Sequence, residues 1–166
     1  EQAAAGSERS RVGLHDAAHL DEQWLPLGLK VALAKSGYHA GEQIQASLSC
    51  EKPCFVIVVH ADAQGQRTLV LPNQWQNHTA IAAGQRIEFP AANSPLQLKV
   101  AAPFGKESLD IYASDVAMND FPSTPIGNDF RRPEPQLEQR YIQKRQSVSQ
   151  KERQFVARRL SFDTRP

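Results

Sequence analysis

The sequence has few cysteines, one methionine and no long apolar run. Its longest uninterrupted apolar stretch, Cys54–Val59, falls far short of the about 20 residues that a transmembrane helix needs. It also lacks a Gly-x-Ser-x-Gly nucleophile elbow and a glycine-rich phosphate loop. These absences argue against a membrane-spanning helix, a serine hydrolase and a nucleotide-binding enzyme.

Length and composition favour one globular domain with flanking segments. The chain has 166 residues, of which 40% are hydrophobic and 22% charged, ordinary values for a globular protein. Eleven prolines lie mostly at the borders of apolar runs. This distribution suits many short strands better than a helical bundle, because proline costs least at a strand end.

The net charge of +1 hides an asymmetry. From Arg131 onward there are ten Lys and Arg residues against four Asp and Glu, which gives +6; residues 1–130 hold nine and fourteen, which gives −5. A basic C-terminal segment favours contact with an acidic partner, although a solvated helix face explains the same charges. We expect a protein partner and no nucleic acid.

Apolar residues alternate with polar ones through the middle of the chain, as they do in half-buried strands. The strand segments are 27–34, 43–49, 55–61, 67–72, 86–90, 95–103 and 108–115, of which 55–61 is almost continuously apolar, as in a central strand. Their spacing and the turns between them predict an all-β fold, an antiparallel immunoglobulin-like β-sandwich of seven or eight strands over residues 27–115.

The two ends differ from this core. Residues 1–26 are predicted to be a flexible lead-in with a possible short helix, closed by Pro26. Residues 116–155 are predicted to be a proline-rich irregular loop followed by a basic, helix-compatible segment. Residues 156–166 alternate between apolar and polar residues and are predicted to be a final strand that returns to the sheet. In such a strand Arg158 and Arg159 point to opposite faces, so one of these charged side chains would face the core.

Cys50 and Cys54 admit four interpretations. Zinc requires four ligands, and no second cysteine pair exists; a thioredoxin-type centre has two intervening residues rather than three. Two buried thiols in a cytosolic protein remain possible. We favour a disulfide, because a tight turn at residues 51–53 would make the cysteines the facing pair of a hairpin. A persistent disulfide indicates an oxidising compartment.

Several motifs resemble a bacterial domain of unknown function that recurs beside serine/threonine kinases, caspase-like peptidases and envelope lipoproteins. The matching elements, within residues 27–115, are Tyr38-x-x-Gly41-Glu42, Phe55–His60, Asp62-x-x-Gly65, Leu69–Asn73, Ala83-Gly84 before Pro90, and Pro103-x-Gly105-x-Glu107. The resemblance implies a β-sandwich accessory domain with no established catalytic residues. The cysteine pair departs from it, because the family usually has an aspartate-glycine or serine-rich turn there.

The histidines, Cys54 and Asp110 give only weak indications of metal-binding or catalytic chemistry. His15 and His19 have i, i+4 spacing but lack the glutamate of a metalloprotease motif. Cys54 and His60 have no third group to orient the imidazole, and Asp110 is expected to be an ordinary surface acid. We therefore expect no enzyme activity, no metal site and no cofactor.

Two surfaces are candidates for binding. The first is a polar loop around an aromatic residue, which suits binding of a sugar or a peptide. The alternative is that the tryptophan folds over the open end of the sandwich. The loop contains Gln74, Trp75, Gln76, Asn77 and His78. The second is the basic tail, expected to project into solvent, which contains Arg131, Arg132, Arg140, Lys144, Arg145, Lys151 and Arg153.

The function expected from the sequence is a non-catalytic, protein-binding accessory module of a bacterial cell-envelope or secretion-type assembly. The alternative is a β-sandwich that binds carbohydrate or peptidoglycan through the Trp75 loop. From the expected disulfide we expect either one to work outside the cytoplasm, in a periplasm or attached to an envelope by an N-terminal anchor outside this sequence.

Overall fold

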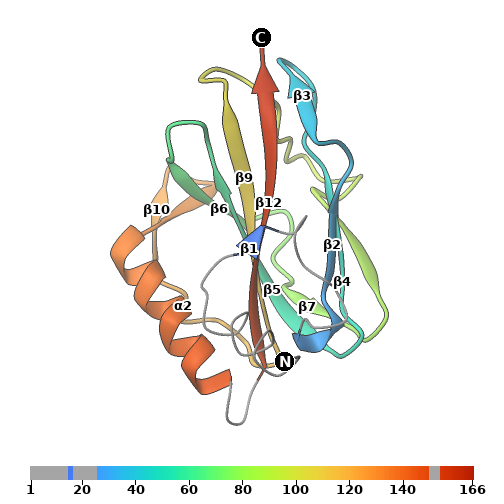
Figure 1. The fold of residues 1–166 in the computed structure, drawn as a ribbon, viewed down its shortest axis with the longest axis vertical. Coiled ribbons are helices and arrows are strands. Elements are labelled where there is room, and N and C mark those ends of the chain that lie inside the picture. Colours follow the sequence, from blue (N-terminus) through green and yellow to red (C-terminus); the bar gives the residue numbers. More distant parts are fainter. Residues whose placement is uncertain (1–14, 17–25, 150–153) are drawn as a thin grey trace, which may run out of the picture.

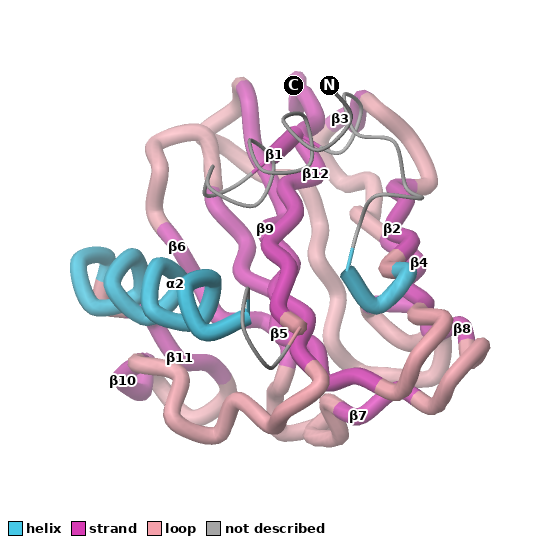
Figure 2. Tube along the Cα trace, turned by 60° about the horizontal axis from the view of Figure 1, so that its bottom comes forward, coloured by secondary structure: helices cyan, strands magenta, loops and turns pink. Residues whose placement is uncertain are grey.

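The computed structural model describes residues 15–16, 26–149 and 154–166, and within them the chain forms three layers. A small sheet packs against one face of a large sheet, and one helix covers part of the other face (Figure 1). Figure 2 shows the same order, with the helix and the small sheet on opposite sides of the central strands. The all-β sandwich expected from the sequence is confirmed.

The large sheet runs in the order β1-β12-β9-β5-β6-β11-β10, with β3 also paired to β12 and β7 to β5. Its strands are β1 (His15–Asp16), β3 (Gly37–His39), β5 (Cys54–Ala61), β6 (Arg67–Leu71), β7 (Ala80–Ile81), β9 (Lys106–Ser114), β10 (Ser123–Ile126), β11 (Phe130–Pro133) and β12 (Phe155–Arg165). The pairing is antiparallel except that β1 and β3 run parallel to β12, which departs from the wholly antiparallel expectation.

The small sheet has the order β2-β4-β8, and both of its pairings are antiparallel. Its strands are β2 (Lys30–Leu33), β4 (Ala46–Ser49) and β8 (Arg86–Phe89), and the 3-10 turn η3 (Pro26–Gly28) precedes β2. Alternation explains the packing: Ala46 and Leu48 are buried against the large sheet, whereas Ser47 and Ser49 are half-buried.

Strand β5 lies at the centre of the large sheet and is apolar on both faces. Val56 and Val58 belong to the core between the sheets, whereas Ile57 and Val59 belong to a second core under the helix. A strand covered on both sides is expected to be continuously apolar rather than alternating. We call the two sides the sandwich face and the helix face.

Three local expectations are wrong. Residues 95–103 form no strand, because prolines at both ends limit a regular ladder of hydrogen bonds. The segment instead contributes buried Leu96 and Val100 to the core and one isolated bridge, Gln43↔Lys99. The segment 35–43, expected to be a turn, contains β3. The segment 116–134, expected to be irregular, contains the β10–β11 hairpin, which joins the large sheet through Arg131↔Leu69.

The last strand, β12, pairs with β9 over nine residue pairs, from Phe155↔Ser114 to Asp163↔Lys106. Val156, Leu160 and Phe162 face the sandwich core. Arg158 shares that face and is only 2% exposed, whereas Arg159 faces the helix side. Successive side chains of β12 thus point to opposite faces of the sheet along the whole strand, including Arg158 and Arg159.

Helix α2 (Pro135–Ser149) packs its inner side on the helix face of the large sheet (Figure 1). Ile142 is buried and Tyr141 half-buried against Phe121, while Leu137 remains 46% exposed. Pro135 is the first helical residue, where a missing backbone donor costs nothing. Among the described residues, no helix has the length and apolarity to cross a membrane.

Candidate binding site on the helix side of the large sheet

A buried network of charges fixes helix α2 to the sheet. Arg67 on β6 donates to the Glu138 carboxylate on α2 at 2.8 and 2.6 Å and lies 2.7 Å from Asp110 on β9. Arg159 on β12 donates to both oxygens of Asp110, at 2.8 and 3.0 Å. The Tyr112 hydroxyl donates to Glu138. Four elements are thereby tied together on one face.

This network corrects the expectation that Asp110 is a surface acid, because its side chain is 0% exposed. Two arginines compensate the buried carboxylate, as a buried charge requires. Burial alone would lower the pKa of Arg67, but the bond to Glu138 and the charge of Asp110 outweigh it and raise that pKa. Burial, followed by the charge of Glu138, raises the pKa of Tyr112 well above its usual range.

Arg145 also serves the fold, so the expectation that it projects into solvent is wrong. It donates to the Ser114 hydroxyl and to the Val116 carbonyl, and its guanidinium lies 5.8 Å from the Tyr141 ring centroid and 5.9 Å from that of Phe155. Cation–π contacts of this kind hold a guanidinium against an aromatic layer.

A pocket of about 280 Å³ opens on the helix face beside the residues that α2 covers. It lies where the strand next to β5 is interrupted: β6 pairs with Val58–Ala61, β7 pairs with Cys54 and Phe55, and the loop 72–79 connects them. Its lining residues are Ile57, Leu69, Pro72, Asn77, Thr79, Met118, Asn119, Phe121, Ser123 and Arg131. We call it the helix-side pocket.

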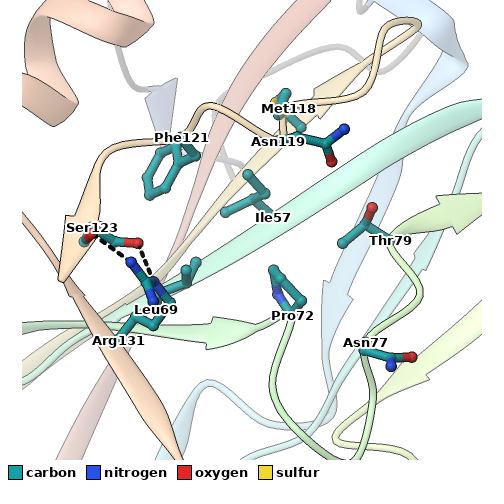
Figure 3. A pocket seen from close by; sticks show the side chains of 10 residues that line it. All are labelled: Ile57, Leu69, Pro72, Asn77, Thr79, Met118, Asn119, Phe121, Ser123 and Arg131. Carbon is teal, nitrogen blue, oxygen red and sulfur yellow. Dashed lines mark hydrogen bonds between the residues drawn. The ribbon is translucent and has the colours of Figure 1, made fainter. Parts of the chain in front are cut away.

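The lining combines an apolar floor with a polar rim. In Figure 3, Ile57 and Pro72 lie in the middle, Arg131 and Ser123 at one end, and Asn77 and Thr79 at the other. An apolar concavity with a few convergent polar groups is the usual form of a ligand site. The pocket brings together Asn77 from the polar loop and Arg131 from the basic tail, which the sequence indicated separately.

Asn73 fixes the start of the loop that contributes Asn77 and Thr79 to this pocket. Its side-chain amide donates to the Val70 carbonyl at 2.7 Å, and its side-chain oxygen accepts from the backbone N–H groups of Trp75 and Gln76, both at 2.9 Å. Asparagine commonly forms such turns by bonding to the backbone two residues onward. The Leu-Pro-Asn motif thus ends β6 and directs the loop outward.

Arg131 is exposed and held in place at the opposite wall. Its Nε donates to the Ser123 hydroxyl and its second terminal nitrogen to the Ser123 carbonyl, both at 2.7 Å. These bonds use one edge of the guanidinium, so the edge formed by its two terminal nitrogens can still donate hydrogen bonds to a ligand. Within the described residues, no carboxylate lies within 4.0 Å of Arg131.

Trp75 does not line the pocket. It is 40% exposed, and its ring meets that of Phe130 edge-on, with centroids 6.4 Å apart. Phe130 precedes Arg131 on β11 and faces the sandwich core, so Trp75 lies toward the other side of the hairpin. Trp75 therefore contacts the β10–β11 hairpin on the side of the sandwich core. Gln74 is bonded to Asp129 at 2.5 Å, and His78 is exposed.

The Cys50–Cys54 disulfide is present, with both residues buried and their Cα atoms 6.6 Å apart. Its expected place as the closing pair of a hairpin is wrong, because β4 and β5 belong to different sheets. The chain crosses from the small sheet to the large one at Glu51–Pro53. The bond therefore ties the two layers of the sandwich together.

Strand geometry separates Cys54 from His60. Six residues of extended chain span about 20 Å, and Cys54 is oxidised. His60 Nε2 instead lies 2.7 Å from Glu107, whose other oxygen accepts from Thr164 at 3.1 Å. Within the described residues, no hydroxyl or thiol bonds to the second ring nitrogen of His60. The group joins three strands.

The remaining predicted residues are placed as follows. Arg140 and Lys144 are exposed on α2 and Arg132 is half-buried, whereas Lys151 and Arg153 lie outside the described residues. His19 and the side chain of His15 also lie outside them. The part of the chain that the structure describes contains no group of three or more His, Cys, Asp and Glu side chains placed to hold a metal.

The pocket's other polar lining residues, Thr79, Asn119 and Ser123, were not predicted. All three lie in connections or in the missed hairpin, where hydrophobic periodicity gives no signal.

Pro125, on the terminal strand β10, lacks a backbone donor and thereby protects that edge against pairing with another strand.

Comparison with known proteins identifies one region of the chain. Residues 37–117 match the family model described as Domain of unknown function (DUF4384), in agreement with the resemblance to a domain of unknown function. Neither curated proteins nor solved structures gave a significant match. Because the matched region ends just before Met118, five of the ten pocket-lining residues lie within it and five follow it.

Proposed function

We propose that this chain is a non-catalytic, protein-binding accessory module of an extracytoplasmic assembly, such as one in a bacterial cell envelope or secretion system. The helix-side pocket is the proposed binding site, and Arg131 at its rim together with exposed cations on α2 complements an acidic partner. The partner segment presents an apolar group to the floor of the pocket and a carboxylate to Arg131.

The observation that carries this proposal is the combination of an apolar floor with a guanidinium that has no carboxylate partner among the described residues. The network around Asp110 and Glu138 fixes β6, which contributes Leu69 to the pocket floor, to β9 and α2. A prearranged site loses little conformational entropy on binding.

A stripe on the outer side of α2 extends the proposed contact. Leu137, Arg140 and Lys144 are exposed and recur at helical spacing, so they share one side of the helix. Exposed cations at an interface accelerate encounter with an acidic partner more than they increase final affinity.

The disulfide supports the compartment that we propose. Such bonds persist outside the cytoplasm, whereas cytosolic thiols are kept reduced. The absence of a catalytic role is supported by His60 and Glu107, which bond within the fold, and by the oxidised Cys54.

The test is a pull-down from bacterial envelope extracts with two charge-reversed proteins. The test variant is Arg131→Glu/Arg140→Glu/Lys144→Glu, and the matched control is Lys30→Glu/Lys99→Glu/Lys106→Glu, which changes the net charge equally at exposed sites elsewhere. We expect a defined partner that the control retains and the test variant loses. Equal loss from both would indicate unspecific charge attraction and contradict the proposal.

A second candidate is a carbohydrate-binding module, favoured by the 40% exposure of Trp75. An exposed indole can stack on a sugar ring while neighbouring amides bond to hydroxyl groups. Saturable binding in a glycan screen that Trp75→Ala abolishes, without any specific protein partner, would replace the first candidate with this one.

A further inference from the structure

We infer that the helix-side pocket recognises the carboxyl-terminal residue of a partner chain, with an apolar side chain on the floor and the terminal carboxylate on Arg131. This inference rests on the proposed function and narrows it to one kind of peptide ligand. It follows from the size of the pocket, the free edge of the guanidinium and the protected neighbouring strand.

The size of the pocket suits one side chain. Its volume of about 280 Å³ is at the lower end of the range of about 300–1,000 Å³ typical of sites for small molecules. The floor of Ile57, Leu69 and Pro72 fits one aliphatic or aromatic side chain.

The charge must therefore come from the same residue as the apolar group. In a carboxyl-terminal residue the side chain and the carboxylate share one Cα, so both enter one small pocket. An internal aspartate or glutamate places its carboxylate on a different residue from the apolar side chain. The terminal residue satisfies both requirements at once, as in other sites that capture a terminal carboxylate.

Arg131 has the geometry for this carboxylate. Ser123 holds its Nε edge with two bonds of 2.7 Å, so the edge formed by the two terminal nitrogens can donate two parallel bonds to a carboxylate. Asp120 accepts from the Tyr141 hydroxyl at 2.9 Å and Asp129 from Gln74, and within the described residues neither carboxylate lies within 4.0 Å of Arg131.

An internal extended segment is disfavoured by the neighbouring strand. The nearest strand edge for such a segment to pair with is that of β10, which ends the large sheet and contributes Ser123 to the pocket. Pro125 offers no backbone donor there, and the Ser123 carbonyl already accepts from Arg131. A terminal residue needs no such pairing, and Asn77, Thr79 and Asn119 remain to bond the last peptide amides.

The experiment compares three fluorescently labelled sets of short peptides by fluorescence anisotropy. The first ends in Leu, Val or Phe with a free carboxylate, the second has the same sequences with a terminal amide, and the third has an internal glutamate beside the apolar residue and an amidated end. We expect the free-acid set to contain a peptide bound at least about tenfold more tightly than its amide, as a charge-assisted pair implies.

Arg131→Gln is expected to abolish the difference between acid and amide. Arg140→Gln, which removes a charge outside the pocket, should preserve it. Both positions are exposed, so both variants should keep the wild-type melting temperature. A difference that survives Arg131→Gln would place the carboxylate elsewhere and overturn the inference.

Other outcomes separate the inference from the proposed function. If acid and amide bind equally, or the internal-glutamate set binds as tightly as the free acids, terminal recognition is wrong while a peptide-binding pocket remains. If no peptide binds but the charge-reversed variant still loses its partner in the pull-down, the inference fails and the proposed function stands.

Discussion

The two faces of the large sheet are built by different means. On the sandwich face, apolar side chains of both sheets interlock, and the disulfide ties the two layers. On the helix face, a smaller apolar cluster is supplemented by five polar groups in one buried network, and part of the surface stays uncovered as a pocket. Both faces therefore stabilise the domain, the first through apolar packing and a covalent bond and the second through buried charges beside an open pocket.

The largest effect is expected from removing the centre of the network. Asp110→Ala leaves Arg67 and Arg159 without their shared carboxylate, and breaking a buried ion pair costs about 3–5 kcal/mol of unfolding free energy. Urea denaturation of the variant and wild type measures the difference.

The adjacent residue supplies the matched control, because Leu109 faces the sandwich core. Leu109→Ala should cost about 2–5 kcal/mol through cavity formation, with no dependence on charge. Asp110→Asn, which keeps shape but loses charge, should resemble Asp110→Ala rather than wild type. A loss below about 1 kcal/mol for Asp110→Ala would mean that the network contributes little to stability.

Removal of the disulfide tests the sandwich face. Because the bond closes a very short loop, the chain-entropy relation gives a loss of only about 2 kcal/mol for Cys50→Ala/Cys54→Ala. The same denaturation assay measures it. Mass spectrometry of unreduced wild-type protein should show two hydrogens fewer than the reduced form, and rapid alkylation of two thiols in fresh protein would contradict the bond.

Alkaline pH should weaken the helix face. Burial raises the pKa of Tyr112 and of Tyr141 above the usual value of about 10, and bonds to Glu138 and Asp120 act in the same direction. A raised folded-state pKa gives stability that is complete below about pH 10 and is lost as pH rises toward that folded-state value.

For a buried tyrosine the slope approaches about 1.4 kcal/mol per pH unit. Tyr141 contributes less, because solvent screens it. Denaturation midpoints measured from about pH 9 to 11 should therefore fall less steeply for Tyr112→Phe than for wild type. Identical slopes for the two proteins would show that Tyr112 ionises normally in the folded state.

The same difference between the faces explains what the sequence could predict. Strand β4 follows from apolar alternation, because its core-facing residues recur every second position, and β5 follows from a continuous apolar run. Asp110 looked like a surface acid, because its partners Arg67 and Arg159 come from distant parts of the chain. A single strand's pattern contains no information about a helix that later covers it.

The candidate site was predicted in part. Asn77 and Arg131 were each named, one for a possible ligand loop and one for charge, but their proximity depends on the β10–β11 hairpin, which the four prolines of segment 116–136 concealed. Arg145 was assigned to the exposed surface because helical spacing alone did not show that Ser114 and Phe155 lie beneath it.

The most direct test of recognition by the helix face is the dissociation constant of the captured partner for two variants, measured by isothermal titration. Asn119→Trp places an indole at the rim of the helix-side pocket, and Ala92→Trp places one at an exposed position next to the small sheet. We expect Asn119→Trp to weaken binding at least about tenfold, or 1.4 kcal/mol, and Ala92→Trp to leave it unchanged. Weakening by Ala92→Trp with full affinity in Asn119→Trp would contradict recognition by the helix face.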